Sequence, residues 1–354
     1  MFSQLKDMKV IGMAAAVSNK WVSIQEVSDE PEAVLKKFTK NIGVEGRYAA
    51  GLMQTTSDFC FAAAEKILTD KGINREEIGI LVFVTQTEDY GIPSTACVLQ
   101  DRLGLSKDCL AFDVNLGCSG FTYGITIAGC LLNTTDTRYA LLLCGDTSAK
   151  ERSAKEKTKT SHSAALLFGD SGTATLIEKT PGEKDILVSS RTDGAGFKAI
   201  ISPFKAWRHP DVPEGYVKGT QMDEFAVFNF ATEEASAQIN EYMEVTNTTP
   251  DDYDCLVLHQ ANLMILKRIA KKTNFPTEKN LISIDKFGNT SSSSIPISLV
   301  NTYGSLQENK TIHALCCGFG VGLSWSTLSL EINANDIYPL VHTDDYFDDG
   351  YPYE

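Results

Sequence analysis

The sequence of 354 residues lacks the marks of several protein classes. No apolar run approaches the roughly 20 residues of a membrane-spanning helix, which excludes insertion into a membrane by that route. No basic start followed by an apolar block and a small-residue cleavage site is present, so we expect a cytoplasmic protein. The nine cysteines are odd in number and contain no Cys-x-x-Cys pair, which argues against a zinc ribbon or a disulfide framework. We therefore expect no metal site.

Basic residues are also scarce. The chain has 32 lysines and arginines against 46 acidic residues, a formal net charge of −14, which repels nucleic acid and predicts no such partner. Part of the acidic excess lies in the last segment, 332–354, where acidic residues alternate with tyrosines. We expect this tail to be a solvated extension, because terminal segments are commonly poorly ordered. A docking peptide for a partner is the alternative.

The rest of the chain has ample material for a large core, with 43% hydrophobic residues. Apolar runs typical of strands occur at 10–17, 80–85, 110–115, 139–144, 174–177, 186–190, 255–259, 281–284, 312–316 and 322–330. Helical patterns occur at 55–71, 94–103, 119–133, 223–243, 262–273 and 292–303. This alternation predicts an α/β fold with buried sheets. Two long loops, 148–163 and 198–222, interrupt it and are candidates for lining a substrate entrance.

The two halves of the sequence resemble each other. A polar helix exit followed by an apolar strand with a polar end occurs at 74–86 and again at 249–260. The pattern at 139–145 similarly returns at 312–318. Similarity at so long a period predicts duplication of a half-domain. We therefore expect halves at 1–180 and 181–331, with corresponding loops meeting at one central site, and the tail at 332–354.

Cys118 is the cysteine best placed for chemistry. An apolar strand ends before Gly117, and a helix with apolar residues at helical spacing begins just after Cys118. The N-terminus of a helix presents unpaired N–H groups and a partial positive charge, which favour a thiolate. Cys118 is thus a candidate nucleophile, although a buried structural cysteine is an equally good interpretation of this residue alone.

Three further motifs contain polar groups or glycines at strand ends. His259 stands where a buried strand ends and a helix begins, the usual place for ligand-facing residues in α/β sheets. Asn289 lies in a glycine-containing turn before four serines, where a plain helix cap is the simpler interpretation. The glycine-rich segment 317–324 could direct N–H groups into a pocket, but it lacks the spacing of a phosphate loop.

Together these motifs resemble, in order and wording, the β-ketoacyl-acyl-carrier-protein synthase III family of thiolase-like condensing enzymes. The matching segments are 113–123 around Cys118, 259–263 (His-Gln-Ala-Asn-Leu) and 288–291 (Gly-Asn-Thr-Ser), with smaller similarities at 93–94, 168–170 and 318–320. The resemblance runs from about residue 8 to about residue 331. It implies a thiolase-like fold of two pseudo-duplicated halves in an α-β-α-β-α arrangement.

The resemblance also implies a mechanism. An acyl thioester transfers its acyl group to Cys118, a malonyl thioester loses CO2, and the resulting enolate attacks the acyl-cysteine. His259 and Asn289 are suited to donate hydrogen bonds to the enolate oxygen, and the backbone N–H groups of Cys118 and Val321 form a second oxyanion hole. Coenzyme A or phosphopantetheine thioesters are then substrates, and no cofactor is needed. The expected partners are acyl carrier protein or acyl-CoA and a second copy of the chain, in a homodimer with the 90–93 loop near the other subunit's site.

Some positions depart from the family pattern. Val321 replaces the middle glycine of a Gly-Gly-Gly, Lys37 stands near the place of a tryptophan that stacks on the coenzyme A base, and Met264 replaces a carrier-docking arginine. One face of the following helix is basic, and we predict that it docks an acidic carrier protein. The residues of this face are Lys267, Arg268, Lys271 and Lys272.

Three other functions are compatible with parts of the sequence. An acyltransferase would pass the acyl group from Cys118 to an alcohol or amine without decarboxylation. A papain-like hydrolase shares the chain order of Cys, His and Asn, but the family's wording around the cysteine is missing. An inactive scaffold partner typically lacks the nucleophile, which is present here. The decarboxylating condensation remains the leading hypothesis.

Overall fold

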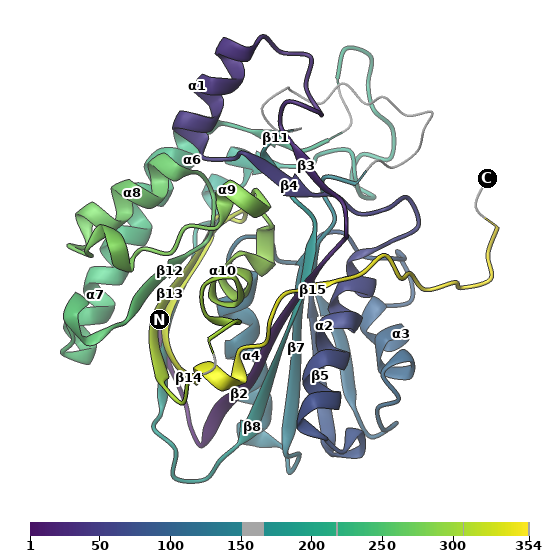
Figure 1. Cartoon of the computed structure of the whole chain (residues 1–354), viewed down its shortest axis with the longest axis vertical. Coiled ribbons are helices and arrows are strands. Elements are labelled where there is room, and N and C mark those ends of the chain that lie inside the picture. Colours follow the sequence, from purple (N-terminus) through teal and green to yellow (C-terminus); the bar gives the residue numbers. More distant parts are fainter. Residues whose placement is uncertain (151–165, 217–218, 307, 353–354) are drawn as a thin grey trace.

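Two β-sheets form the frame of the molecule (Figure 1). The computed structural model describes residues 1–150, 166–216, 219–306 and 308–352. The six-stranded sheet has the order β15 (Val341–His342), β2 (Met8–Val17), β8 (Ser171–Lys179), β7 (Tyr139–Asp146), β5 (Ile78–Val84) and β6 (Leu110–Val114). The five-stranded sheet has the order β1 (Phe2–Leu5), β9 (Ile186–Thr192), β14 (Ser324–Asn333), β13 (Thr311–Gly320) and β12 (Cys255–Leu258).

The helices lie in three layers around these sheets. Between the sheets lie α4 (Gly120–Thr134) and α10 (Ser294–Tyr303), and each contacts strands of both sheets. The six-stranded sheet carries α2 (Thr56–Lys71) and α3 (Thr95–Arg102) on its outer face. The outer face of the five-stranded sheet carries α7 (Ser236–Thr246) and α8 (Leu263–Lys272). The molecule therefore has the expected α-β-α-β-α layering of a thiolase-like fold.

Smaller elements complete the description. Two short antiparallel pairs are β3 (Trp21–Ser23) with β4 (Gly46–Tyr48) and β10 (Ile200–Ile201) with β11 (Gln221–Met222). The remaining helices are α1 (Glu32–Ile42), α6 (Glu224–Phe230) and α9 (Ile284–Phe287). None of the helices in the described ranges is long and apolar enough to cross a bilayer.

Strand order and direction confirm the internal duplication. The order β2-β8-β7-β5 in the six-stranded sheet corresponds strand by strand to β9-β14-β13-β12 in the five-stranded sheet. The strand directions correspond too. Among these four strands of each sheet, β5 and β7 pair in parallel, as do β12 and β13, and the other neighbours are antiparallel. Two terminal strands cross between the halves, since β1 pairs with β9 and β15 pairs with β2.

The largest apolar cluster lies between the two sheets. It contains Val84 and Val257 from the sheets with Ile125 of α4 and Ile297 of α10, all less than 2% exposed. Helices that are apolar on all sides belong in such a buried layer. This packing places the N-terminal ends of α4 and α10 inside the molecule, where the candidate catalytic residues stand.

Three expectations from the sequence need correction. Residues 281–284 are not a strand, because the Gln260 carboxamide oxygen accepts the N–H groups of Ser283 and Ile284, and the chain turns into α9 after a single bridge between Asn280 and Leu256. The helix predicted over 223–243 is interrupted by a wider π turn at Ala231–Ala235. Sequence patterns also missed β1 and α1; only one residue of α1, Leu35, is buried.

The third correction concerns the C-terminal segment, whose part up to Phe347 contacts the body of the molecule, whereas the described residues after it are mostly exposed, as expected. Its strand β15 extends the six-stranded sheet, and the Gln54 carboxamide donates to the carbonyls of Thr343 (3.0 Å) and Asp345 (3.1 Å). Further along, Phe347 stacks on the Arg102 guanidinium with 4.5 Å to the ring centroid. Backbone pairing and an aromatic anchor order this segment despite its acidic composition.

Candidate active site

Cys118 lies between the end of β6 and the start of α4, packed against the last residues of β13. A β-carbon added to Gly320 would fall 2.4 Å from the Cys118 β-carbon and 2.7 Å from its sulfur. One added to Gly318 would fall 3.1 Å from the Cys118 carbonyl oxygen. Real β-carbons do not approach other atoms so closely, so glycine at 320 is what allows the strand to pass beside the thiol.

Burial and, to a smaller extent, the nearby Asp146 carboxylate raise the pKa of the Cys118 thiol to about 11. Hydrogen bonds from the backbone N–H groups of Val321 and of Cys118 itself act in the opposite direction. Burial therefore opposes the ionised thiol expected at the helix N-terminus, and that expectation stays a prediction. The two N–H groups predicted to form an oxyanion hole do converge on the sulfur.

His259 follows β12 and is 1% exposed. Its N–H donates to the Cys317 carbonyl at 2.9 Å, and its ring meets that of Phe319 edge to face, with 5.6 Å between centroids. Burial lowers the pKa of His259 to about 3, although a hydrogen bond with the Ser291 backbone opposes this effect. His259 is thus a neutral imidazole at physiological pH, held beside the same end of β13 that contacts Cys118.

Asn289 is 5% exposed and stands in the turn between α9 and α10. Its main chain pairs with the segment before β8, donating to Leu167 O (2.8 Å) and accepting from Gly169 N (3.1 Å). Gly288, at φ +65°, permits this approach, since a β-carbon there would lie 2.7 Å from Leu167 O. The Asn289 Oδ1 accepts from Ser291 N at 2.9 Å.

The side chains of His259 and Asn289 each keep one polar atom that forms no side-chain hydrogen bond, and these atoms are available to bind a substrate. Within the described part of the chain, no hydrogen bond uses the Asn289 Nδ2, and no side chain bonds the His259 Nε2. One end of each side chain is fixed by Ser291 or its neighbours, and the other end is free to meet a substrate oxygen.

The segment 291–294 connects the three residues. The Ser291 backbone bonds both the Asn289 carboxamide and the His259 ring. Next to it, Ser292 packs so closely on the first turn of α4 that a β-carbon on Gly120 would lie 3.0 Å from the Ser292 β-carbon. These contacts place Cys118, His259 and Asn289 on neighbouring elements, namely β6–α4, β12 and the turn before α10, as one shared site would require.

Two polar side chains beside this site were not singled out by sequence reasoning. Asp146 at the end of β7 is 1% exposed, and burial raises its pKa. Ser294 opens α10 and lies 3.0 Å from the His259 Nδ1. The run of four serines was visible in the sequence, but only the fold shows which hydroxyl faces the imidazole.

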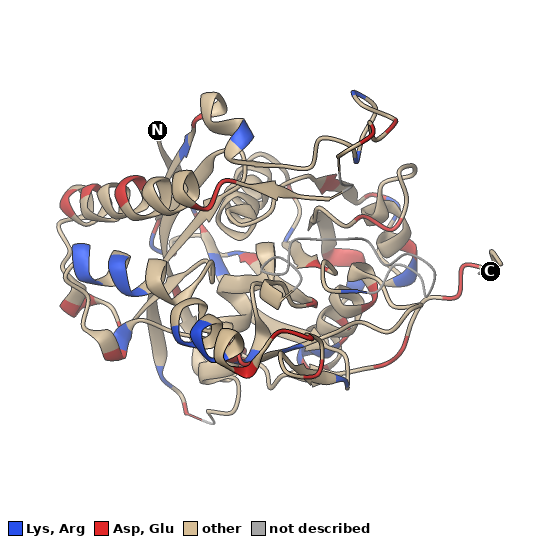
Figure 2. Ribbon diagram, turned by 90° about the horizontal axis from the view of Figure 1, so that it is seen from above, with Lys and Arg blue, Asp and Glu red and all other residues tan. Residues whose placement is uncertain are grey.

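The predicted basic face of α8 is partly paired. The side chains of Lys267, Arg268 and Lys271 are exposed, whereas Lys272 is less exposed and forms an ion pair with Glu233 at 2.5 Å. On the side of the molecule opposite the C-terminus, where α7 and α8 lie, basic and acidic segments are neighbours (Figure 2). Lys272 is therefore the weakest member of the proposed docking face. Nearby, Met264 is 45% exposed.

Other predicted features lie away from the site or outside the described residues. Most of the basic loop 148–163 falls in 151–165 and lies outside the described ranges. The loop 198–222 contains β10 and β11, and its Lys205 donates to the Gln86 carbonyl. Lys37 lies on α1 and is exposed.

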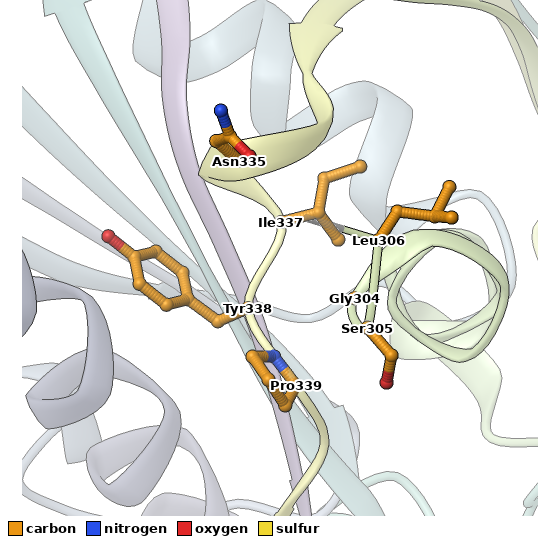
Figure 3. A pocket seen from close by; sticks show the side chains of 7 residues that line it. All are labelled: Gly304, Ser305, Leu306, Asn335, Ile337, Tyr338 and Pro339. Carbon is orange, nitrogen blue, oxygen red and sulfur yellow. The ribbon is translucent and has the colours of Figure 1, made fainter. Parts of the chain in front are cut away.

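A surface hollow of about 290 Å³ lies at the far end of α10 from Ser294. Its walls come from the end of α10 and from the segment that leads to β15, with Leu306 and Ile337 facing each other (Figure 3). None of Cys118, His259 and Asn289 lines it. A helix of ten residues is roughly 15 Å long, so the hollow is separate from the site.

The fold and the site define an α/β protein of the thiolase-like class. Family models describe residues 112–194 as 3-oxoacyl-[acyl-carrier-protein] synthase III and residues 243–332 as its C-terminal part. A β-ketoacyl-[acyl-carrier-protein] synthase III of Clostridium perfringens is 30% identical over 336 residues, 93% of this chain and 100% of the relative. The same enzyme of Caldanaerobacter subterraneus is 32% identical over 294 residues, 82% of this chain and 87% of the relative.

A solved structure agrees with these sequences. The crystal structure of a 3-oxoacyl-(acyl-carrier protein) synthase from Burkholderia xenovorans has a TM-score of 0.89 and 31% identity, and covers 97% of this chain and 99% of its own. The chain belongs to the β-ketoacyl-acyl-carrier-protein synthase III family. The resemblance found in the sequence is thereby confirmed, and with it the conclusion that this is an enzyme; a papain-like hydrolase is excluded.

Proposed function

We propose that this enzyme joins an acyl thioester to a malonyl thioester by decarboxylating condensation, through an acyl-cysteine at Cys118. The arrangement that supports this most is that Cys118 and His259 both contact the end of β13, while the Ser291 backbone contacts both the imidazole and the Asn289 carboxamide. The chain's relatives carry the name β-ketoacyl-[acyl-carrier-protein] synthase III.

The first step is acyl transfer. The Cys118 sulfur attacks the thioester carbonyl, the bond to the leaving sulfur breaks, and the thiol hydrogen ends on the leaving group. The backbone N–H groups of Cys118 and Val321, which converge on the sulfur, stabilise the negative oxygen of the tetrahedral intermediate. Each such donor contributes roughly 3 kcal/mol to the barrier reduction.

The second step is condensation. The malonyl carboxylate leaves as CO2, and its electron pair passes to the thioester as an enolate. The Asn289 Nδ2 and the His259 imidazole are the groups placed to hold the enolate oxygen. The enolate carbon then attacks the acyl carbon, and Cys118 leaves as a thiolate that takes up one proton. These steps use no metal and no redox group.

The partners follow from the same chemistry. We propose an acyl carrier protein or coenzyme A as the thioester carrier, with Lys267, Arg268 and Lys271 docking the acidic carrier protein. We also propose a homodimer in which the 90–93 loop approaches the other subunit's site; the Ile92 side chain in this loop is 89% exposed.

Mass spectrometry and CO2 release test the proposal together. Incubation with short acyl thioesters should add an acyl mass to the peptide that contains Cys118, and Cys118→Ala should abolish both this adduct and the condensation product. Release of CO2 from a malonyl thioester separates condensation from acyl transfer to an alcohol or amine. Condensation at an undiminished rate in Cys118→Ala would refute the assignment.

A further inference from the structure

The loop 90–93 carries an apolar side chain at its tip. Its Ile92 side chain is 89% exposed, and the two neighbouring residues are exposed as well. A loop with so few packing contacts at its tip depends on the residues that flank it for a fixed position. One hydrogen bond lies within the loop itself, from the Asp89 N–H to the Thr95 hydroxyl at 3.1 Å. Two further connections lead to the C-terminal segment, residues 341–352.

The first connection is a direct hydrogen bond between the loop and the segment. The Tyr90 hydroxyl donates to the Asp349 carboxylate at 2.6 Å, across 259 positions of sequence. This distance is typical of a bond from a hydroxyl to an ionised carboxylate, which is roughly twice as strong as a bond between neutral groups. The same carboxylate accepts the Tyr351 N–H at 3.0 Å, so the chain turns around this contact.

The second connection is a cluster of polar side chains around Arg102, which is shared by the segment and the loop. The Arg102 guanidinium donates to the Asp58 carboxylate (2.9 Å) and to the Ser57 hydroxyl (2.8 Å). Ser57 in turn donates to the Asp89 carboxylate at 2.6 Å. From the segment, the Phe347 N–H donates to Asp58 at 2.9 Å, and the Phe347 ring stacks on the guanidinium. A continuous set of contacts thus runs from Phe347 to Asp89 at the start of the loop.

We propose that the C-terminal segment positions the 90–93 loop, with Phe347 and Asp349 as positioning residues, and that the choice of acyl primer therefore depends on this segment. The effect on primers rests on the proposed condensation and homodimer, whereas the contact of segment and loop belongs to a single chain. The match to the family's C-terminal part ends at residue 332, before both residues. In an apolar pocket one methylene of substrate changes kcat/KM by roughly 10- to 200-fold, so a small displacement of the loop tip is enough to alter selectivity.

Hydrogen–deuterium exchange of the free enzyme tests the positioning directly. Asp349→Ala should speed amide exchange in the peptide that spans residues 88–95 by roughly fivefold or more, because the loop loses its bond to the segment. Asp349→Asn should retain the wild-type exchange, since its carboxamide oxygen still accepts from Tyr90. Asp348→Ala is the matched control, because it removes the neighbouring carboxylate, which accepts the Gly350 N–H within the segment. Equal exchange in the wild type and in Asp349→Ala would overturn the inference.

Primer selectivity is the second measurement, made with acyl-CoA primers of two to eight carbons and a malonyl thioester. Asp349→Ala should reduce the ratio of kcat/KM between the best primer and one two carbons longer by about tenfold, with Asp349→Asn and Asp348→Ala close to wild type. Ile92→Ala should change the same ratio, and adding Asp349→Ala to it should change it little further, because both act through one side chain. An equal fall in kcat/KM for every primer, or an unchanged ratio, would contradict the role in selectivity.

The outcomes separate this inference from the proposed function. If the wild type formed no acyl-Cys118 and released no CO2, the proposed function would fail, while exchange would still decide whether the segment holds the loop. A wild-type enzyme that condenses as a monomer in solution would contradict an effect on a partner subunit's site.

Discussion

Gly320 and Cys118 are in such close contact that a β-carbon at residue 320 would lie 2.7 Å from the Cys118 sulfur. The strand β13 therefore forms one wall of the thiol site with its backbone alone. Gly320 belongs to the five-stranded sheet, whereas Cys118 connects β6 of the six-stranded sheet to α4. The absence of a side chain at residue 320 is what lets these two parts of the molecule pack together here.

The first prediction follows from this contact. Gly320→Ala should displace Cys118 or close the space that an acyl group needs, and should reduce acylation of Cys118 by roughly 100-fold or more. Mass spectrometry of the acylated peptide measures this loss. Gly194→Ala is the control, because a β-carbon there meets nothing within 4 Å, and should leave acylation unchanged. Normal acylation in Gly320→Ala would contradict this prediction and show that β13 or Cys118 can shift to accommodate the added methyl group.

The second prediction concerns the ionisation of Cys118. Since burial raises the pKa of Cys118 to about 11, its thiolate fraction should increase about tenfold per pH unit between pH 7 and pH 10. Alkylation of Cys118 by iodoacetamide in the free enzyme, followed by peptide mass spectrometry, should increase in rate accordingly. A rate that is already constant above pH 7 would indicate a stable thiolate at the helix end.

The third prediction uses the buried imidazole. Because the pKa of His259 is about 3 in the folded protein and about 6.5 in an unfolded chain, the unfolded state binds the extra proton below pH 6.5. This group should therefore lower the free energy of unfolding by roughly 2 to 3 kcal/mol between pH 7 and pH 4.5. His259→Gln, which cannot be protonated, should show a correspondingly smaller loss in urea titrations at the two pH values. An equal loss in both proteins would contradict the depressed pKa.

Two kinds of pattern made the layered fold and the three candidate catalytic residues predictable. One is a short arrangement of neighbouring residues, and the other is the similarity between the two halves of the sequence. Strand–glycine–cysteine–helix and strand–histidine are local arrangements, and the similarity of 139–145 to 312–318 indicated two equivalent halves. The strand expected at 281–284 shows the limit, since a single side chain, Gln260, takes the backbone N–H groups that a strand would pair.

Long-range effects account for the other differences. The N-terminal position of Cys118 on a helix suggested a thiolate, but its pKa also depends on residues about 200 positions away: Gly320 packs against the thiol, and the Val321 N–H donates a hydrogen bond to it. The acidic composition of the last segment suggested solvation, but pairing with β2 and stacking on Arg102 are tertiary contacts that composition does not reveal.

The fourth prediction tests the anchoring of that last segment. The Arg102 guanidinium lies between the rings of Phe61 (4.8 Å) and Phe347 (4.5 Å) and is paired with Asp58 at 2.9 Å. Phe347→Ala should lower the free energy of unfolding by about 1 to 2 kcal/mol, through loss of the cation–π contact and of buried area. Thermal and urea unfolding measure the change. Tyr351→Ala, at a residue that is 75% exposed, is the control and should have no effect.

The fifth prediction concerns the exposed basic residues of α8. If Lys267 and Lys271 dock an acidic carrier protein, the double change to glutamate should raise KM for a malonyl group on acyl carrier protein about tenfold at low salt, and less at high salt, where charges are screened. The KM for malonyl-CoA should remain within about twofold, because docking charges act on the carrier and not on the reacting atoms. The double change Lys36→Glu and Lys40→Glu on α1 is a charge-matched control, since both side chains are exposed and lie on another helix. An equal rise in KM for both substrates would place these lysines at the substrate entrance, and no rise for either would remove α8 from the docking surface.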